Sequence, residues 1–170
     1  MPNSSSSKTK NSFVSSPSDE DVVIVSALRT PLCRARKGAL AKIPPSTFLT
    51  ALFEATITGC RGKIDGHEIE DICLGNCLMS SSGFAAMRMA QIVGGIPETV
   101  PLHWINRQCS SGLQAVAHIA NGISSGQITV GLGGGVESMS MNPMYVTQPI
   151  VKGLAFDAKL SYTHAVSISL

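Results

Sequence analysis

The chain has 170 residues, of which 44% are hydrophobic and 14% are charged, and its formal net charge is +2. This length supports a domain with its own apolar core, and the composition is that of a soluble globular protein rather than a disordered chain. The basic residues are scattered apart from a small cluster at Arg34, Arg36 and Lys37, which argues against a nucleic-acid partner. No apolar run approaches the roughly 20 residues that a membrane span requires.

The composition changes twice along the chain and predicts three regions. Residues 1–21 are dominated by Ser, Asn, Lys and Pro and cannot bury enough apolar surface to fold, so we expect a disordered leader. Residues 22–144 show regular hydrophobic patterns and are predicted to form one domain. Residues 145–170 lose this periodicity and are predicted to be an irregular tail.

Strands and helices are predicted to alternate from the start of the domain. Val22–Ser26 is a β-branched run without alternation, which is typical of a strand covered on both faces. Ser46 can cap a helix that ends near Gly59, because its apolar residues recur at helical spacing. Asp71–Gly75 is predicted to be a second buried strand.

The alternation continues through the second part of the domain. Helices are predicted over Ala85–Val93 and Ser110–Ile123, and a short strand over Val100–Ile105 with a proline at its beginning. Ile128–Leu132 is predicted to be a further strand, followed at Gly133–Gly135 by backbone conformations barred to other residues. The order of elements predicts an α/β fold with a parallel sheet.

Cys109 is the strongest candidate for a reactive residue. It follows a predicted strand and precedes a predicted helix, where the helix dipole and unpaired backbone N–H groups favour a thiolate. The same N–H groups can stabilise an oxyanion, and the small residues Ser110, Ser111 and Gly112 leave room for a substrate. The alternative is a small buried thiol without a chemical role, which is the commoner use of cysteine.

Other residue types give weaker signals. The remaining cysteines are interpreted as reduced packing or surface thiols of an intracellular protein: Cys33, Cys60, Cys73 and Cys77. The histidines have no motif around them and are interpreted as structural rather than as bases: His67, His103, His118 and His164. Glu137 fits a capping or interface role better than a general base, and Gly131–Gly135 lacks the rest of a phosphate loop. No metal site is predicted, because no ligand spacing is present.

The segment Asn106–Ala115 (NRQCSSGLQA) closely resembles the active-site cysteine motif of the 3-ketoacyl-CoA thiolases. Three further segments resemble the family in the same order: Val22–Val25 running into Arg29–Pro31, Gly94–Pro101 and Gly134–Ser140. The resemblance covers Asp21 to Asn142 and is nearest to the peroxisomal fatty-acid β-oxidation branch. It implies a thiolase-type fold, here the N-terminal half of a layered αβαβα architecture with a mostly parallel sheet and covering helices.

The resemblance also implies a chemistry. Cys109 corresponds to the family's acylated cysteine, whose thiolate attacks the keto carbonyl of a 3-ketoacyl-CoA, releases acetyl-CoA and passes the shortened acyl chain to CoA. The Cys109 backbone N–H is then an expected oxyanion donor. Coenzyme A is a substrate, no bound cofactor is implied, and no CoA-binding residue is assigned.

The chain departs from the family pattern in its later part. The family's Asn-Glu-Ala-Phe, Gly-His-Pro and Cys-x-Gly motifs, which belong to the second half, do not occur here. Because general acid–base help is worth about 10²–10⁴ in rate, the chain alone is predicted not to turn over. A second hypothesis is a non-catalytic chain that forms a homodimer or associates with a full-length thiolase subunit. A third, redox sensing through Cys109, lacks an obvious resolving cysteine nearby.

The family resemblance predicts a peroxisomal location. Neither the leader nor the C-terminal Ser-Ile-Ser-Leu matches a recognised peroxisomal import signal. A cytoplasmic location is therefore the alternative.

Overall fold

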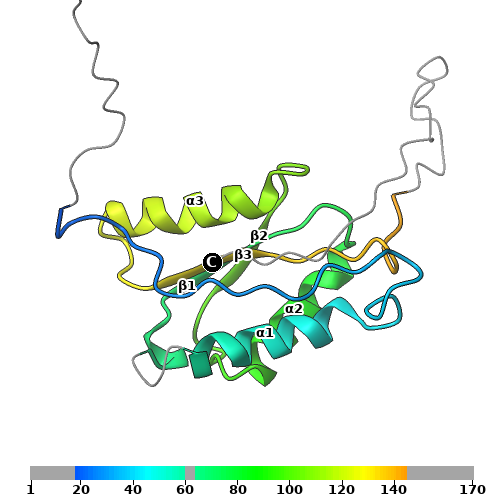
Figure 1. Ribbon diagram of the computed structural model, residues 1–170. Coiled ribbons are helices and arrows are strands. Elements are labelled where there is room, and N and C mark those ends of the chain that lie inside the picture. The colour runs from blue at the N-terminus through cyan, green and yellow to red at the C-terminus, as the bar shows by residue number, and fades with distance from the viewer. Residues whose placement is uncertain (1–17, 60–63, 145–170) are drawn as a thin grey trace, which may run out of the picture.

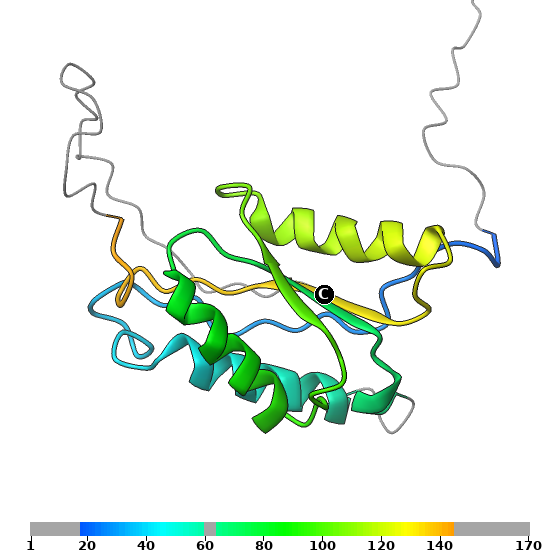
Figure 2. The ribbon, with the colours of Figure 1, turned by 180° about the vertical axis from the view of Figure 1, so that it is seen from behind.

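The computed structural model describes residues 18–59 and 64–144, and in it a small parallel sheet lies between one helix and a pair of helices (Figures 1 and 2). The elements are α1 (Pro45–Gly59), the 3₁₀ helix η1 (Gly66–Glu68), β1 (Asp71–Gly75), α2 (Ser81–Val93), β2 (Leu102–Ile105), α3 (Ser111–Ser124) and β3 (Gly131–Gly135). Most of the predicted leader, Cys60 and the predicted tail with His164 lie outside the described residues. Within the described ranges, no helix combines the length and apolar character that crossing a bilayer demands.

The sheet has the strand order β2-β1-β3, and both pairings are parallel. Ile72 in the central strand is in register with Leu102 on one side and with Leu132 on the other. The carboxyl ends of all three strands therefore meet at one edge of the sheet, where the loops that follow them come together. The predicted parallel α/β fold is confirmed.

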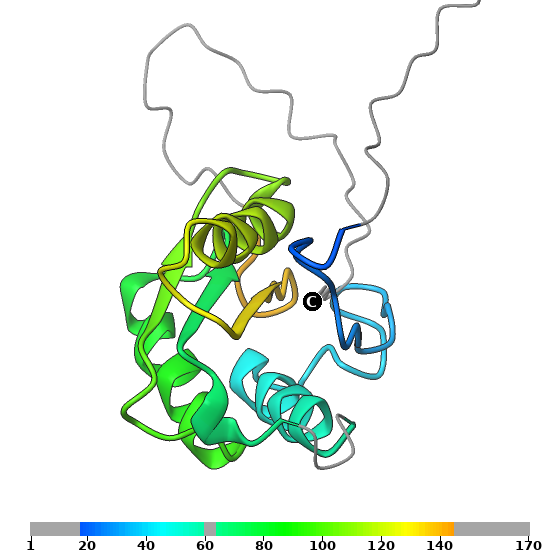
Figure 3. The same cartoon turned by 90° about the vertical axis from the view of Figure 1, so that its left-hand side faces the viewer.

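One face of the sheet carries large apolar side chains that pack against α1 and α2. The end-on view shows both helices on this side of the sheet (Figure 3). The strand residues on this face are Ile72, Leu74, Leu102 and Leu132, and the helices contribute Phe48, Leu49, Leu52, Phe53, Met87 and Ala90. Phe84 of α2 also makes an edge-to-face ring contact with Trp104 of β2. This layer is the main apolar core of the domain.

The opposite face of the sheet has little side-chain volume and lies directly under α3. A Cβ atom added to Gly133 would come within 2.7 Å of the Val116 Cα atom, and one added to Gly75 within 2.3 Å of the Ser111 carbonyl carbon. Cys73, Ala115 and Ile119 fill the space that remains. Glycine at these positions lets the helix backbone approach the sheet backbone.

The predicted bounds of the last strand were wrong. The strand expected at Ile128–Leu132 begins only at Gly131 and continues to Gly135, through the run that was assigned to special backbone conformations. Among the described glycines, a positive φ occurs only at Gly95 and Gly126. The glycines of β3 therefore serve close packing rather than a turn.

The strand predicted at Val22–Ser26 is absent from the sheet. The segment forms no strand, and the residues Val23, Ile24 and Val25 are 69%, 66% and 71% exposed. This segment and Val130–Gly133 both line an open apolar groove. A β-branched sequence alone does not make a strand, because a strand also needs a hydrogen-bonded neighbour.

The other predicted elements are present with small shifts at their ends. The strand at Asp71–Gly75 has the predicted bounds, and β2 begins at Leu102, after the proline that cannot donate to the ladder. The helix predicted from Ala85 starts earlier, at Ser81, and the one predicted from Ser110 starts at Ser111.

Candidate active site

Cys109 lies in the tight turn that joins β2 to α3. The strand ends at Ile105, Ser110 is the N-cap, and α3 begins at Ser111, so Cys109 directly precedes the N-cap, one residue further from the helix than predicted. Gln108 has a φ of 52°, a left-handed conformation that is uncommon for a residue other than glycine. The turn reverses the chain within a few residues and leaves the Cys109 side chain exposed.

A set of hydrogen bonds holds the left-handed residue in place. The Asn106 side-chain oxygen accepts from the Gln108 N–H at 3.0 Å. The Gln108 carbonyl accepts from the Ser111 hydroxyl at 2.5 Å and from the Cys77 thiol at 2.7 Å. The Ser111 oxygen in turn accepts from the Arg107 N–H at 2.8 Å. The strained backbone conformation of Gln108, next to Cys109, is therefore held by hydrogen bonds to both its N–H and its carbonyl.

The N-terminus of α3 is left open beside Cys109. The Ser110 hydroxyl forms no side-chain cap and donates instead to the Arg107 carbonyl at 2.8 Å. The first-turn amides thus lack the side-chain acceptor that an N-cap serine often supplies. Leu113, in the same turn, is 75% exposed. The positive end of the helix dipole consequently lies next to the thiol, with the Ser111 N–H donating to the Gln108 carbonyl at 3.1 Å.

The loop that follows β1 is hydrogen-bonded to the loops that follow the other two strands, through Glu137 and Asn106. Glu137, after β3, accepts from the N–H groups of Cys77 at 2.9 Å and Leu78 at 3.2 Å, and from the Asn76 side chain at 3.3 Å. Asn106, after β2, donates to the Cys77 carbonyl at 3.3 Å. The loop after β1 is thereby fixed against the turn that carries Cys109.

The Glu137 carboxylate has a structural role in this arrangement. Burial raises its pKa above the usual range, while hydrogen bonds from the backbone at Cys77, Leu78 and Ser138 and from the Asn76 side chain oppose that shift. Because its oxygens are committed to these donors, the capping role considered from the sequence describes it better than that of a general base.

The thiols near the site differ in their surroundings. Burial, with a smaller effect of the Asp71 charge, raises the pKa of Cys73 to about 11, so this thiol stays protonated near neutral pH. Burial also raises the pKa of Cys77, and the charges of Glu137 and Cys109 act in the same direction, while the hydrogen bond with Ser111 opposes them. Among the four cysteines that the structure describes, Cys109 is the exposed one, and Cys33 is half-buried elsewhere in the chain.

Cys77, Asn76 and Asn106 are the site residues that the sequence did not single out. Cys77 was interpreted as a packing or surface thiol, and its thiol donates to the carbonyl of Gln108, the residue before Cys109. The available signal was positional, because each of these residues follows the carboxyl end of a predicted parallel strand. The redox hypothesis therefore gains a second thiol close to Cys109 in space.

The described histidines do not assemble around Cys109. His103 and His118 face Asp71 at the amino end of β1, whereas Cys109 lies beyond the carboxyl end of the sheet. His67 is exposed in η1. Within residues 18–59 and 64–144, no histidine is therefore placed beside Cys109, and the interpretation of the histidines as structural stays a prediction.

A parallel α/β domain with an exposed cysteine before an open helix N-terminus is suited to covalent catalysis through a thiolate. The family model described as "Thiolase, N-terminal domain" matches residues 22–168. The chain belongs to the thiolase family.

Curated relatives and solved structures agree with this membership. The chain is 46% identical over 127 residues to the mouse protein "3-ketoacyl-CoA thiolase A, peroxisomal", covering 75% of this chain and 30% of the relative. It is 43% identical over 136 residues to the human "3-ketoacyl-CoA thiolase, peroxisomal", covering 78% and 32%. The crystal structure of the dimeric peroxisomal thiolase of Saccharomyces cerevisiae matches with a TM-score of 0.68 and 39% identity, covering 75% of this chain and 33% of that one. The chain thus spans about a third of the length of these relatives.

Proposed function

We propose that this chain carries the nucleophile of a 3-ketoacyl-CoA thiolase reaction and that Cys109 is the residue acylated. The observation that carries the proposal is the exposed Cys109 thiol between a braced left-handed turn and the open N-terminus of α3. The names of the relatives supply the substrate class, 3-ketoacyl-CoA.

In the proposed reaction the Cys109 thiolate attacks the 3-keto carbonyl carbon and forms a tetrahedral oxyanion. The Cys109 N–H and the uncapped first turn of α3 lie beside this centre and are the proposed oxyanion donors. The oxyanion collapses, the bond between C2 and C3 breaks, and C2 takes up a proton, so that acetyl-CoA leaves. The acyl group remains as a thioester on Cys109 until the thiol of a second CoA attacks it and restores the cysteine.

Residues 1–170 alone are proposed to supply the nucleophile without its acid–base partners. His103 and His118 lie with Asp71 at the other end of β1, and Glu137 is committed to backbone amides, so none of them is placed to move a proton at Cys109. Loss of general acid–base help lowers a rate by about 10²–10⁴. We therefore expect acylation without turnover.

The test is intact-protein mass spectrometry after incubation with acetyl-CoA or a 3-ketoacyl-CoA, together with a thiolysis assay on the same sample. We expect an acyl adduct that disappears in Cys109→Ala and persists in Cys33→Ala, a matched change of a thiol outside the site. An adduct that survives in Cys109→Ala, or no adduct on the folded chain, contradicts the assignment of the nucleophile. Measurable turnover contradicts the predicted inactivity.

A second candidate function is that of a non-catalytic partner that forms a homodimer or binds a full-length thiolase subunit. Exposed apolar residues favour it, notably Ile24, Val25 and Trp104, the last on the edge strand β2. The yeast structure is described as that of a dimeric thiolase. Light scattering after size-exclusion chromatography, with and without a full-length peroxisomal thiolase, tests the idea, and a chain that stays monomeric in both experiments excludes it.

We propose a peroxisomal location, supported by the names of the relatives, with the cytoplasm as the alternative. A fluorescent fusion expressed with a peroxisomal marker tests this directly. Diffuse fluorescence, both alone and beside a full-length thiolase, would favour the cytoplasm.

A further inference from the structure

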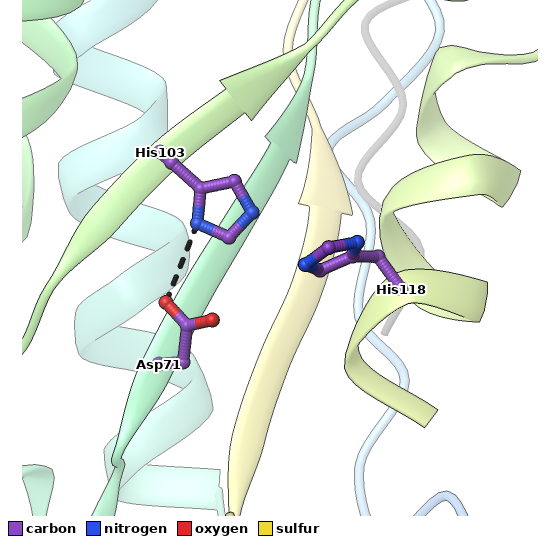
Figure 4. A group of neighbouring side chains, drawn as sticks. All are labelled: Asp71, His103 and His118. Carbon is purple, nitrogen blue, oxygen red and sulfur yellow. Dashed lines mark ion pairs between the residues drawn. The ribbon is translucent and has the colours of Figure 1, made fainter. Parts of the chain in front are cut away.

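Away from Cys109, three side chains from three different elements converge beside the sheet (Figure 4). Asp71 is the first residue of β1, His103 lies in β2, and His118 projects from α3. His103 Nδ1 and a carboxylate oxygen of Asp71 are 3.4 Å apart, and the rings of His103 and His118 meet edge to face with centroids 5.0 Å apart. One donor atom from each residue lies within 4.8 Å of the other two.

We propose that Asp71, His103 and His118 form a binding site for a divalent transition-metal ion, with Zn²⁺ as the best match. Two imidazoles and one carboxylate are donors that zinc accepts readily, and three protein ligands leave a fourth position for water. The sequence did not predict a metal site because the three residues come from separate elements and show no local ligand spacing.

The observed geometry needs little change to hold the ion. In a tetrahedral site with bonds of 2.0–2.1 Å, neighbouring donor atoms are about 3.3 Å apart. The Asp71 and His103 atoms already have this separation. His118 is exposed on α3, so rotation of its side chain is expected to close a remaining gap of at most about 1.5 Å.

The surroundings also suit a partly open site. The strand register Ile72↔Leu102 fixes the backbones that carry Asp71 and His103, so two of the three ligands are held in advance. Their side chains are 22% and 41% exposed, which leaves an approach for the ion and for a bound water. The Asp71 carboxylate offsets part of the charge of the ion.

A bound ion would join α3 to both β1 and β2 at the end of the sheet away from Cys109. Metal that binds only the folded state stabilises that state, so zinc is expected to raise the melting temperature. This inference does not depend on the proposed thiolase activity, because its ligands and its readout lie outside the Cys109 site.

The experiment uses the full chain, freed of metal with a chelator and titrated with zinc chloride in a calorimeter. We expect one Zn²⁺ per chain and at least a tenfold loss of affinity in both His103→Gln and His118→Gln. The matched control is His67→Gln, a change of an exposed histidine in η1, which should bind as the unmodified chain does. Asp71→Asn, which keeps the shape of the side chain, is a second ligand variant in case a histidine variant does not fold.

Binding by thiols has to be distinguished from binding at this site. Cys77→Ser and Cys109→Ser are expected to keep full zinc affinity, and Co²⁺ bound to the unmodified chain is expected to show no thiolate charge-transfer absorption. The proposal is overturned if the folded chain binds no zinc, if both histidine variants bind it unchanged, or if only the cysteine variants lose it.

Discussion

The two faces of the sheet are built in opposite ways. Toward α1 and α2 the strands present Ile72, Leu74, Leu102 and Leu132, whereas toward α3 they present Asp71, Cys73, Gly75, His103, Gly131 and Gly133. The first face gains stability from the apolar volume it buries, and the second from the closeness with which a helix can approach. The candidate nucleophile, Cys109, precedes the helix on the second face, so the small residues under α3 determine where that helix and the Cys109 turn lie.

The face toward α1 and α2 should be most sensitive to the removal of volume. Leu74 is fully buried in β1, and Leu74→Ala is expected to lower the free energy of unfolding by about 2–5 kcal/mol, because it leaves a cavity in the core. Urea unfolding followed by circular dichroism measures the change. Leu113→Ala, at an exposed position of α3, is the control and should change stability by less than about 0.5 kcal/mol. Equal effects would mean that the assigned core is wrong.

The face toward α3 should be most sensitive to the addition of volume. Gly133→Ala would place a methyl group 2.7 Å from the Val116 Cα atom, and we expect a loss of about 1–3 kcal/mol in urea unfolding because backbone must move. At Gly112 an added Cβ meets no atom within 4 Å, so Gly112→Ala is the matched control and should be nearly neutral. If Gly133→Ala were equally well tolerated, close packing of α3 would not be required.

The loops at the edge of the sheet should depend on the Glu137 carboxylate. Glu137→Gln replaces an acceptor oxygen with an NH₂ group that faces backbone N–H donors, so we expect a loss of about 1–3 kcal/mol at mildly acidic pH. Glu54→Gln, a change of the same type on the exposed side of α1, should leave the unfolding curve nearly unchanged. Comparable losses of stability in the two variants would show that Glu137 has no special role in holding the loops.

The effect of Glu137→Gln on stability is expected to depend on pH. Because the pKa of Glu137 is raised, the folded state binds its proton more tightly than the unfolded state does. The resulting stabilisation is present at low pH and is lost as pH rises from the ordinary glutamate pKa through the raised one. The difference in free energy of unfolding between the unmodified chain and Glu137→Gln should therefore narrow over that pH interval. A difference that widens would contradict a raised pKa of Glu137.

The smallest expected effect is a difference in chemical labelling between two thiols of the unmodified chain. Iodoacetamide at neutral pH should modify Cys109 in the folded chain and spare Cys73, because Cys73 is buried and its pKa is raised to about 11. Peptide mass mapping after brief labelling measures both sites. Unfolding in urea should abolish the difference, and equal labelling of the two thiols in the native chain would contradict the assigned burial.

The sequence predicted best those features that depend on neighbouring residues. The strand–turn–helix segment around Cys109 is local, and so are the apolar patterns of α1 and α3, so their places were found. Strand pairing is not local, and for that reason Val22–Ser26 was assigned a strand that no described neighbour completes. The glycines of β3 were misinterpreted because the need for them comes from α3 packed above them.

Side-chain groups assembled from distant segments were beyond prediction for the same reason. Glu137 and Cys77 are 60 residues apart in the chain, and neither carries a motif that names the other. Asp71, His103 and His118 likewise come together only when β1, β2 and α3 pack. The predicted parallel sheet places the loops after its strands at one edge, but it does not specify the hydrogen bonds between them.

The central position of β1 also has a consequence for folding kinetics. The first strand in the chain is the middle strand of the sheet, so both of its partners lie later in the sequence. Long-range parallel pairing of this kind forms slowly. The turn around Cys109 can form as soon as β2 and α3 meet, whereas the Cys77 loop gains its carboxylate anchor only after β3 has docked. We therefore expect the turn that carries Cys109 to form before the neighbouring Cys77 loop that braces it.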